Sequence, residues 1–339
     1  MILLHQTRLN MTTMVLTPIV VMLVCATVSA VQAQTHMSAP LVYFGAMDGS
    51  AAVAIDSQFF ANASDEDNVI RIYPRERGGE PVQAIDLSSF LEVDPLSPET
   101  DIEAAARICN RAYWITSHGR NKSGKERVSR HRFFATDIRT NEHGIQIVAA
   151  GKPYKDLLDD LTAAEPLKQF DLAAAAARAP KSPGGLAIEG LAATPDGRLV
   201  IGFRNPVPKG RALLVPMLNP DEVIDGQRAR FGKPIQLDLG GLGIRDIALW
   251  QGEFVIIAGP SASDGALKLF LWKGADTLPK PIKHISLKGL HPEAIVIYPD
   301  KGLREFQLLS DDSTMMKDAT AKSAPTLLKK QFRSIWITP

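Results

Sequence analysis

An acidic residue opens each of five segments that share a pattern of strand, turn and strand. The segments open at residues 47–50, 102–105, 188–191, 245–248 and 292–295. Carboxylates that recur at a fixed place in a repeated unit can bind a hard divalent cation, or act as acids and bases, when the repeats bring them together. The five acidic residues are Asp48, Glu103, Glu189, Asp246 and Glu293.

The second strand of each segment ends on polar residues. In an antiparallel hairpin, the start of the first strand lies beside the end of the second, so the first and last residues of a copy share one rim. The expected neighbours are Asp48 with Asp65, Glu103 with His118, Glu189 with Arg204, Glu293 with Asp311 and Asp312, and Asp246 with Gly259 and Ser261. We therefore expect one rim that carries both acidic and basic side chains.

The element that positions these residues is a propeller blade. A repeated unit of about forty to fifty residues made of strands is typical of a β-propeller. The five openings predict an all-β fold, a single domain over residues 40–339 with five four-stranded blades. The last blade is one strand short, and a closed ring tolerates no open edge, so residues 41–46 should complete it beside residues 335–337.

One insertion interrupts the series of strands. Residues 154–179 are rich in Leu and Ala, with Leu157, Leu158 and Leu161 at helical spacing. This pattern predicts two short helices, which either cap one face of the ring or pack at its periphery.

Five acids at one channel mouth would repel each other without a counter-charge. A bound Ca²⁺ or another divalent cation can supply that charge, and so can basic residues. The candidate metal ligands are Glu103, Glu189, Asp246, Glu293 and Asp311. The alternative is that each acid only caps a turn or accepts hydrogen bonds from neighbouring backbone N–H groups.

A basic loop follows His118. Residues 117–132 contain six Lys or Arg against one Glu, and Arg and Lys are the usual donors to phosphate and carboxylate groups. The candidate ligand-binding residues are Arg120, Lys122, Arg204 and Asn205, and the candidate catalytic residues are Glu189, His118 and Arg204. A solvated surface loop explains the same composition equally well.

The overall charge limits the range of partners. The formal net charge is +1, which argues against a general nucleic-acid binder. We expect a small anionic ligand or a protein partner, and a monomeric chain.

The first 33 residues have the layout of a signal peptide. Arg8 precedes an apolar run over residues 14–30, and small residues at 31–33 offer a cleavage site near Ala33. Export to the periplasm or the exterior follows, with the membrane contacted only through this segment; an uncleaved anchor is the alternative. Cys109 would then be the only cysteine, and we expect it to be buried and inert.

Several stretches carry a resemblance to a known family. These are residues 63–68, 117–122, 188–192, 202–206 and 243–247. Together they resemble an uncharacterised family of secreted bacterial proteins, domain of unknown function 3616. The Glu189-Gly190-Leu191-Ala192 stretch and the turn at residues 195–197 are also similar to propellers labelled phytase-like esterases. Glu293 is followed by Ala294 where this family commonly has glycine, which weakens the resemblance in the fifth repeat.

Two functions from different classes fit these observations. The first is a metal-assisted phosphoesterase, in which rim carboxylates hold the cation that polarises a phosphoryl group and activates water. In that case His118, Arg120 and Arg204 would stabilise the developing charge. The second is a propeller without catalytic activity, whose rim binds a small anionic ligand or a protein partner.

Overall fold

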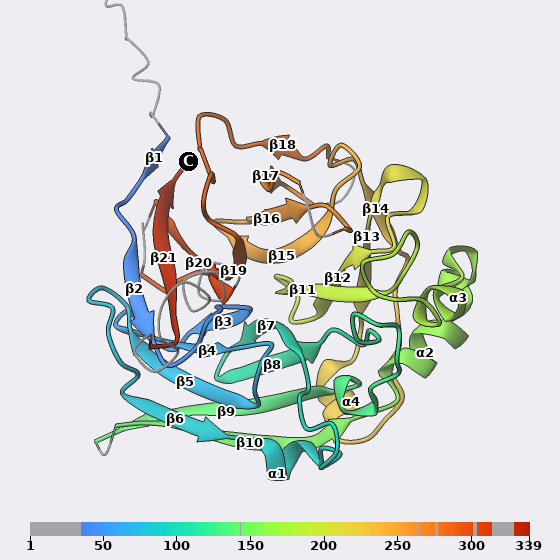
Figure 1. Cartoon of the computed structure of the whole chain (residues 1–339), viewed down its shortest axis with the longest axis horizontal. Coiled ribbons are helices and arrows are strands. Elements are labelled where there is room, and N and C mark those ends of the chain that lie inside the picture. The colour runs from blue at the N-terminus through green and yellow to red at the C-terminus, as the bar shows by residue number, and fades with distance from the viewer. Residues whose placement is uncertain (1–34, 143, 263–264, 275–276, 301–303, 314–328) are drawn as a thin grey trace, which may run out of the picture. The chain divides into compact units, whose positions relative to one another are not determined.

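The computed structural model describes residues 35–142, 144–262, 265–274, 277–300, 304–313 and 329–339 (Figure 1). The predicted signal peptide lies outside these residues. Within them, no helix has the length and apolar character that crossing a bilayer requires.

The strands form five antiparallel sheets, which are the five blades of a propeller. In the first four blades the chain enters at the innermost strand and runs outward, and each strand pairs with the next strand in sequence. Blades 1 and 2 comprise β3 (Ala51–Ala54), β4 (Phe59–Ala63), β5 (Val69–Pro74) and β6 (Gln83–Asp86), then β7 (Ile102–Ile108), β8 (Arg111–Thr116), β9 (Phe133–Asn141) and β10 (Gly144–Tyr154). Blades 3 and 4 comprise β11 (Ala187–Ala193), β12 (Leu199–Asn205), β13 (Ala212–Met217) and β14 (Ile235–Leu237), then β15 (Gly243–Trp250), β16 (Glu253–Gly259), β17 (Lys268–Trp272) and β18 (Lys280–Pro281).

The fifth blade closes the ring with strands from both ends of the described chain. It consists of β19 (Pro292–Val296), β20 (Phe306–Ser310) and β21 (Gln331–Thr338), with β2 (Leu41–Phe44) and β1 (His36–Met37) paired to β21. Leu41 lies opposite Ser334 and Phe44 lies opposite Gln331, whereas the end of β21 pairs with β1. The predicted five-bladed ring, completed by an N-terminal strand, is therefore confirmed. The predicted partner residues 335–337 are wrong, because β2 pairs with residues 331–334 and β1 pairs with Ile337 and Thr338.

The inner strands β3, β7, β11, β15 and β19 contact one another in sequence order, and β19 contacts β3 to complete the circle (Figure 1). Among the described residues, the buried apolar side chains form five clusters, one between each pair of neighbouring blades. Tyr43 and Phe332, for example, stack between blades 5 and 1 with ring centroids 5.2 to 5.4 Å from their aromatic neighbours. Each blade is thus held by apolar packing on both of its faces.

The helices lie outside the ring of inner strands. They are α1 (Ser88–Leu91), α2 (Leu157–Ala163), α3 (Leu172–Ala176) and α4 (Pro220–Ile224). Leu157, Leu161 and Leu172 are buried in the cluster between blades 2 and 3, and α2 and α3 lie at the outer edge of the ring in Figure 1. The insertion therefore has the predicted helices, and its buried residues act as peripheral packing.

The prediction that Cys109 is buried is wrong. Cys109 and Asn110 form the two-residue turn between β7 and β8, where Ile108 pairs with Arg111. Both turn residues are exposed, and Cys109 has the left-handed φ of 54° that such turns require.

Candidate functional site: a charged channel mouth

A β-bulge interrupts four of the five inner strands near their first residue. The register shifts between Ile102 and Ala104, Ile188 and Gly190, Ile244 and Asp246, and Pro292 and Ala294. A bulge leaves its extra residue out of the ladder and re-aims that side chain. The extra residues are Glu103, Glu189, Arg245 and Glu293. Four neighbouring blades thus each present one charged side chain at the same end of the channel.

The fourth blade contributes Arg245 to this set, not Asp246. Asp246 pairs with Ile257 in the ladder, and its Oδ2 accepts a hydrogen bond of 2.7 Å from the backbone N–H of Ile295 on the next blade. Burial raises the pKa of Asp246 well above its ordinary value. The structure therefore places this candidate metal ligand between blades 4 and 5, where it links them.

Glu189 is neutralised by two arginines. Its Oε1 lies 2.8 Å from Nη1 of Arg204, and its Oε2 lies 3.1 Å from Nε of Arg245. Arg245 also forms an ion pair with Glu293. Burial alone would raise the pKa of Glu189, but the charges of Arg204 and Arg245 outweigh burial and hold the pKa below its ordinary value.

A second group of carboxylates lies beside Glu189 and has fewer counter-charges. Asp65, Asp101 and Glu103 each offer one oxygen, and these three oxygens lie within 4.8 Å of one another. Asp101 is buried, with its Oδ2 2.8 Å from Nη1 of Arg130, whereas Asp65 and Glu103 remain partly accessible. We call Asp65, Asp101 and Glu103 the acidic triad.

Burial, with the repulsion between neighbouring carboxylates added to it, raises the pKa of each residue of the acidic triad. Burial, followed by the charge of Asp48, raises the pKa of Asp65 well above its ordinary value. Burial, followed by the charge of Glu189, does the same to Glu103. Burial also raises the pKa of Asp101 to about 6, although Arg130 opposes this.

Asp48 and Asp311 add negative charge next to the triad. Asp48 accepts hydrogen bonds from the hydroxyls of Ser50 (2.9 Å) and Ser64 (2.7 Å) and from the backbone N–H of Asp65 (3.2 Å). Burial is the main cause of the raised pKa of Asp48 and of Asp65, and the charge of Asp311 adds to it in both. Asp312 is engaged elsewhere, in an ion pair with Arg333 at 2.7 Å.

His118 is buried and neutral. Its Nδ1 lies 2.8 Å from the carbonyl oxygen of Thr116, which it reaches as a donor, and its Nε2 has no hydrogen-bond partner among the described residues. Its ring stacks on that of His131 at 5.7 Å. Burial, followed by the charge of His131, lowers the pKa of His118 to about 3. His118 thus carries no positive charge that could offset Glu103.

The side chains expected to bind an anion are mostly engaged by backbone carbonyls. Arg204 donates to Pro260 O (3.1 Å) and Ala262 O (2.7 Å) as well as to Glu189. Arg120 donates to Ala176 O (2.9 Å) and Gly124 O (3.2 Å). Asn205 donates to Pro180 O and Ser182 O at 2.8 and 2.7 Å. Lys122 is exposed in the loop between β8 and β9.

Asp101 and Arg245 are the residues of this site that sequence reasoning missed. Asp101 precedes Glu103 by two residues, so the close pair of acids was a usable signal. Strand alternation alone would not predict their contact, because Asp101 has a left-handed φ of 62° and Glu103 is the bulge residue. Arg245 was hidden because the bulge shifts the repeat by one residue, and no feature of the sequence Arg245-Asp246 shows which of the two is extra.

The fold and the charged mouth define a five-bladed propeller with a carboxylate cluster at one end of its channel. A family model described as "Protein of unknown function (DUF3616)" matches residues 129–296, which confirms the resemblance to that family over those residues. A sequence search among curated proteins finds no match.

Two solved structures are similar to this chain at a low level. Glutaminyl cyclase of Myxococcus xanthus is 12% identical, with a TM-score of 0.44, and the match covers 90% of this chain and 96% of that chain. The PQQ-bound aldose sugar dehydrogenase of Streptomyces coelicolor is 11% identical, with a TM-score of 0.43, and the match covers 90% of this chain and 99% of that chain. At these values the likeness carries no argument about activity.

Proposed function

We propose that this protein is an exported propeller that binds a divalent cation at the acidic triad, with Ca²⁺ as the preferred ion. The observation that carries the proposal is the set of three carboxylate oxygens from Asp65, Asp101 and Glu103 within 4.8 Å of one another. Ca²⁺ prefers oxygen ligands at about 2.3–2.6 Å, and two oxygens that share one ion lie at a separation of this order. Water and backbone carbonyls would complete the coordination shell.

The charge balance of the mouth supports cation binding. Arg204 and Arg245 form their ion pairs with Glu189 and Glu293. The charge of Arg245 also lowers the pKa of Glu103, but burial and the neighbouring carboxylates outweigh it. The raised pKa values of Asp65 and Glu103 mean that keeping both ionised costs free energy in the unliganded protein. A divalent cation removes that cost, which gives it a driving force beyond the coordination bonds.

The same contacts favour ligand binding over phosphoester hydrolysis. Arg120, Arg204 and Asn205 already donate hydrogen bonds to backbone carbonyl groups. An anionic ligand would therefore interact with the bound cation and not with these side chains. A bound cation can still polarise a phosphoryl group, so a metal-assisted phosphoesterase is the second function to test. In that reaction His118 would be a poor base, because it is buried and its pKa is lowered to about 3.

Export fits the design of this site. Extracellular Ca²⁺ modules bind with a Kd of about 10⁻⁴–10⁻³ M, weaker than cytosolic sites, because fewer charged ligands hold the ion. A triad of side chains, one of them paired with Arg130, belongs in that weaker class. We therefore propose a periplasmic or extracellular protein whose leader is removed near Ala33.

Calcium titration of the purified protein tests the proposal. After treatment with EDTA, added Ca²⁺ at about 100 times its Kd should stabilise the protein by about 2.7 kcal/mol, measured by urea denaturation. Asp101→Asn and Glu103→Gln should weaken binding in isothermal titration, while Asp238→Asn, at an exposed turn, serves as the matched control.

Two results would contradict the proposal. One is the absence of any Ca²⁺-dependent stabilisation in the wild-type protein. The other is Ca²⁺ binding that survives Asp101→Asn and Glu103→Gln unchanged. A phosphoester substrate panel with and without Ca²⁺ decides between binding and catalysis, because only a phosphoesterase will show turnover that needs the ion.

A further inference from the structure

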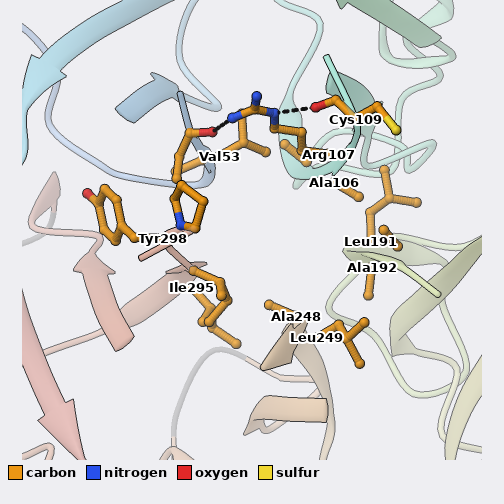
Figure 2. A pocket seen from close by; sticks show the side chains of 16 residues that line it. Val53, Ala106, Arg107, Cys109, Leu191, Ala192, Ala248, Leu249, Ile295 and Tyr298 are labelled. Carbon is orange, nitrogen blue, oxygen red and sulfur yellow. Dashed lines mark hydrogen bonds between the residues drawn. The ribbon is translucent and has the colours of Figure 1, made fainter. Parts of the chain in front are cut away.

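The later residues of the inner strands line a cavity (Figure 2). The bulges that carry the charged mouth lie near the first residues of the same strands, so the cavity is at the other end of the channel. It has a volume of about 390 Å³, and residues from all five inner strands or the turns that follow them line it. Most of these residues are small or aliphatic, such as Ala54, Ala105, Leu191, Ala193 and Leu249. Its size lies at the lower end of the range of about 300–1,000 Å³ that small-molecule sites occupy.

Arg107 is the one charged residue among the lining residues. Its guanidinium lies along one side of the opening in Figure 2, between the end of β3 and the turn at Cys109. Its Nε donates to Cys109 O (2.6 Å), and its Nη1 donates to Ala54 O (2.7 Å) and Ile55 O. These carbonyls fix the direction of the side chain without neutralising its charge.

Arg107 has no carboxylate partner within 4.0 Å among the described residues. The nearest acidic influence is Asp56, which raises the pKa of Arg107 against the lowering effect of burial. The carboxylate of Asp56 instead accepts hydrogen bonds from the backbone N–H groups of Gln58 (2.7 Å) and Phe59 (2.9 Å). The Nη2 of Arg107 has no acceptor among the described residues, so one donor group of the guanidinium is unused.

We propose that this cavity binds a small amphipathic anion, an aliphatic carboxylate, with its chain among the alanine and leucine side chains and its carboxylate beside the guanidinium of Arg107. The apolar lining gains free energy by covering a hydrocarbon chain. A guanidinium held by neutral carbonyls gains a charge-assisted hydrogen bond from an anion. The two features together exclude a purely polar ligand and favour a carboxylate over an uncharged alcohol of the same length.

Cys109 provides a direct probe of this cavity. It lines the opening, it is exposed, and the chain has one other cysteine, Cys25. With Cys25 replaced by Ser wherever the leader is retained, the rate of maleimide labelling reports on Cys109 alone. A ligand in the cavity should shield the thiol.

The experiment measures this labelling rate in the presence of octanoate. At a concentration about ten times its Kd, mass action leaves about one site in ten empty, so the rate should fall about tenfold. Octan-1-ol should protect less. Arg107→Met should weaken octanoate binding by about tenfold or more while leaving protection by octan-1-ol unchanged, as expected for loss of a charge-assisted hydrogen bond. Arg139→Met, at an exposed position on β9, is the matched control.

A second variant tests the apolar part of the site. Ala105→Leu places a larger side chain in the cavity, so protection by octanoate should decrease while Arg107 stays in place. Isothermal titration with octanoate provides a measurement that does not depend on the thiol. Equal protection by octanoate in wild type and Arg107→Met, or no protection in the wild type, would overturn the proposal. Each measurement is repeated in EDTA, so that a failure of Ca²⁺ binding does not affect it.

Discussion

Glu189 and Arg245 stand on neighbouring blades, and Oε2 of the glutamate lies 3.1 Å from Nε of the arginine. Both are the extra residue of a β-bulge, and both side chains are about nine-tenths buried. The arginine also pairs with Glu293 on the following blade. Three of the four bulge residues are glutamates and the fourth is Arg245. Arg245 therefore neutralises the glutamates of the two neighbouring blades, Glu189 and Glu293.

Replacing Arg245 by Met should destabilise the protein by about 3–5 kcal/mol, because it leaves two buried carboxylates without this partner. Arg245→Lys keeps the charge and should lose less. The free energy of unfolding in urea gives both values, and Arg139→Met serves as the surface control. A loss for Arg245→Met no larger than that control would show that the ion pairs do not hold the blades.

Replacing Gly190 by Ala should lower the free energy of unfolding by about 1–3 kcal/mol, because the packing between blades 3 and 4 leaves no room for a methyl group. A Cβ at this position would lie 2.7 Å from Cγ2 of Ile244 and 3.2 Å from Cα of Gly202. Gly232→Ala is the comparison, since its Cβ would meet Pro216 at the looser distance of 3.3 Å. Equal stability of the two variants in urea denaturation would contradict this close approach.

Asp246 offers a test that separates a structural acid from a metal ligand. Asp246→Ala removes the acceptor of the Ile295 N–H and should cost about 1–3 kcal/mol, as expected for an unsatisfied buried donor. Asp246→Asn retains an acceptor and should cost less. Neither variant should change the affinity for Ca²⁺ in isothermal titration. A weaker affinity in Asp246→Asn would show that Asp246 is a metal ligand.

His118 should make the protein less stable in acid. Its folded pKa of about 3 lies below the unfolded value of about 6.5, so the unfolded state binds the proton first. The stability that neutral His118 provides is present above pH 6.5 and is lost as the pH falls, by at most about 1.4 kcal/mol per pH unit. His118→Asn should remove this loss, because asparagine tolerates the φ of 54° and keeps a donor for Thr116 O.

The comparison must be made between variants, because Asp101 acts in the opposite direction. Its raised pKa of about 6 favours the folded state as the pH falls toward the ordinary aspartate range. Subtracting the urea stability of His118→Asn from that of the wild type at each pH isolates the histidine. His284→Asn is the matched control, since His284 is exposed and has a similar φ of 62°. A parallel pH profile in wild type and His118→Asn would contradict the prediction.

The blade count was predictable because an acidic residue, two apolar stretches and a turn recur in each copy, and these depend on local sequence. The same repeated pattern led to a wrong assignment in the fourth blade. Asp246 matches the acidic pattern, yet a one-residue bulge, which no local signal specifies, turns it toward Ile295 and brings Arg245 to the mouth. Asp101 escaped notice because it lies just outside the repeated segment. Cys109 was misplaced because its neighbour Ile108 suggested a core position, whereas the two-residue turn puts it in solvent.

The pairing of β2 with β21 also governs how the chain reaches its native state. Leu41 and Ser334 lie opposite each other although nearly the whole domain separates them in sequence, and contacts of this kind slow folding because the loop between them must be closed first. During synthesis, β2 emerges long before its partner. Until β21 follows it, Tyr43 and the exposed edge of the fifth blade have nothing to cover them, so the nascent protein depends on its final strand for protection against aggregation.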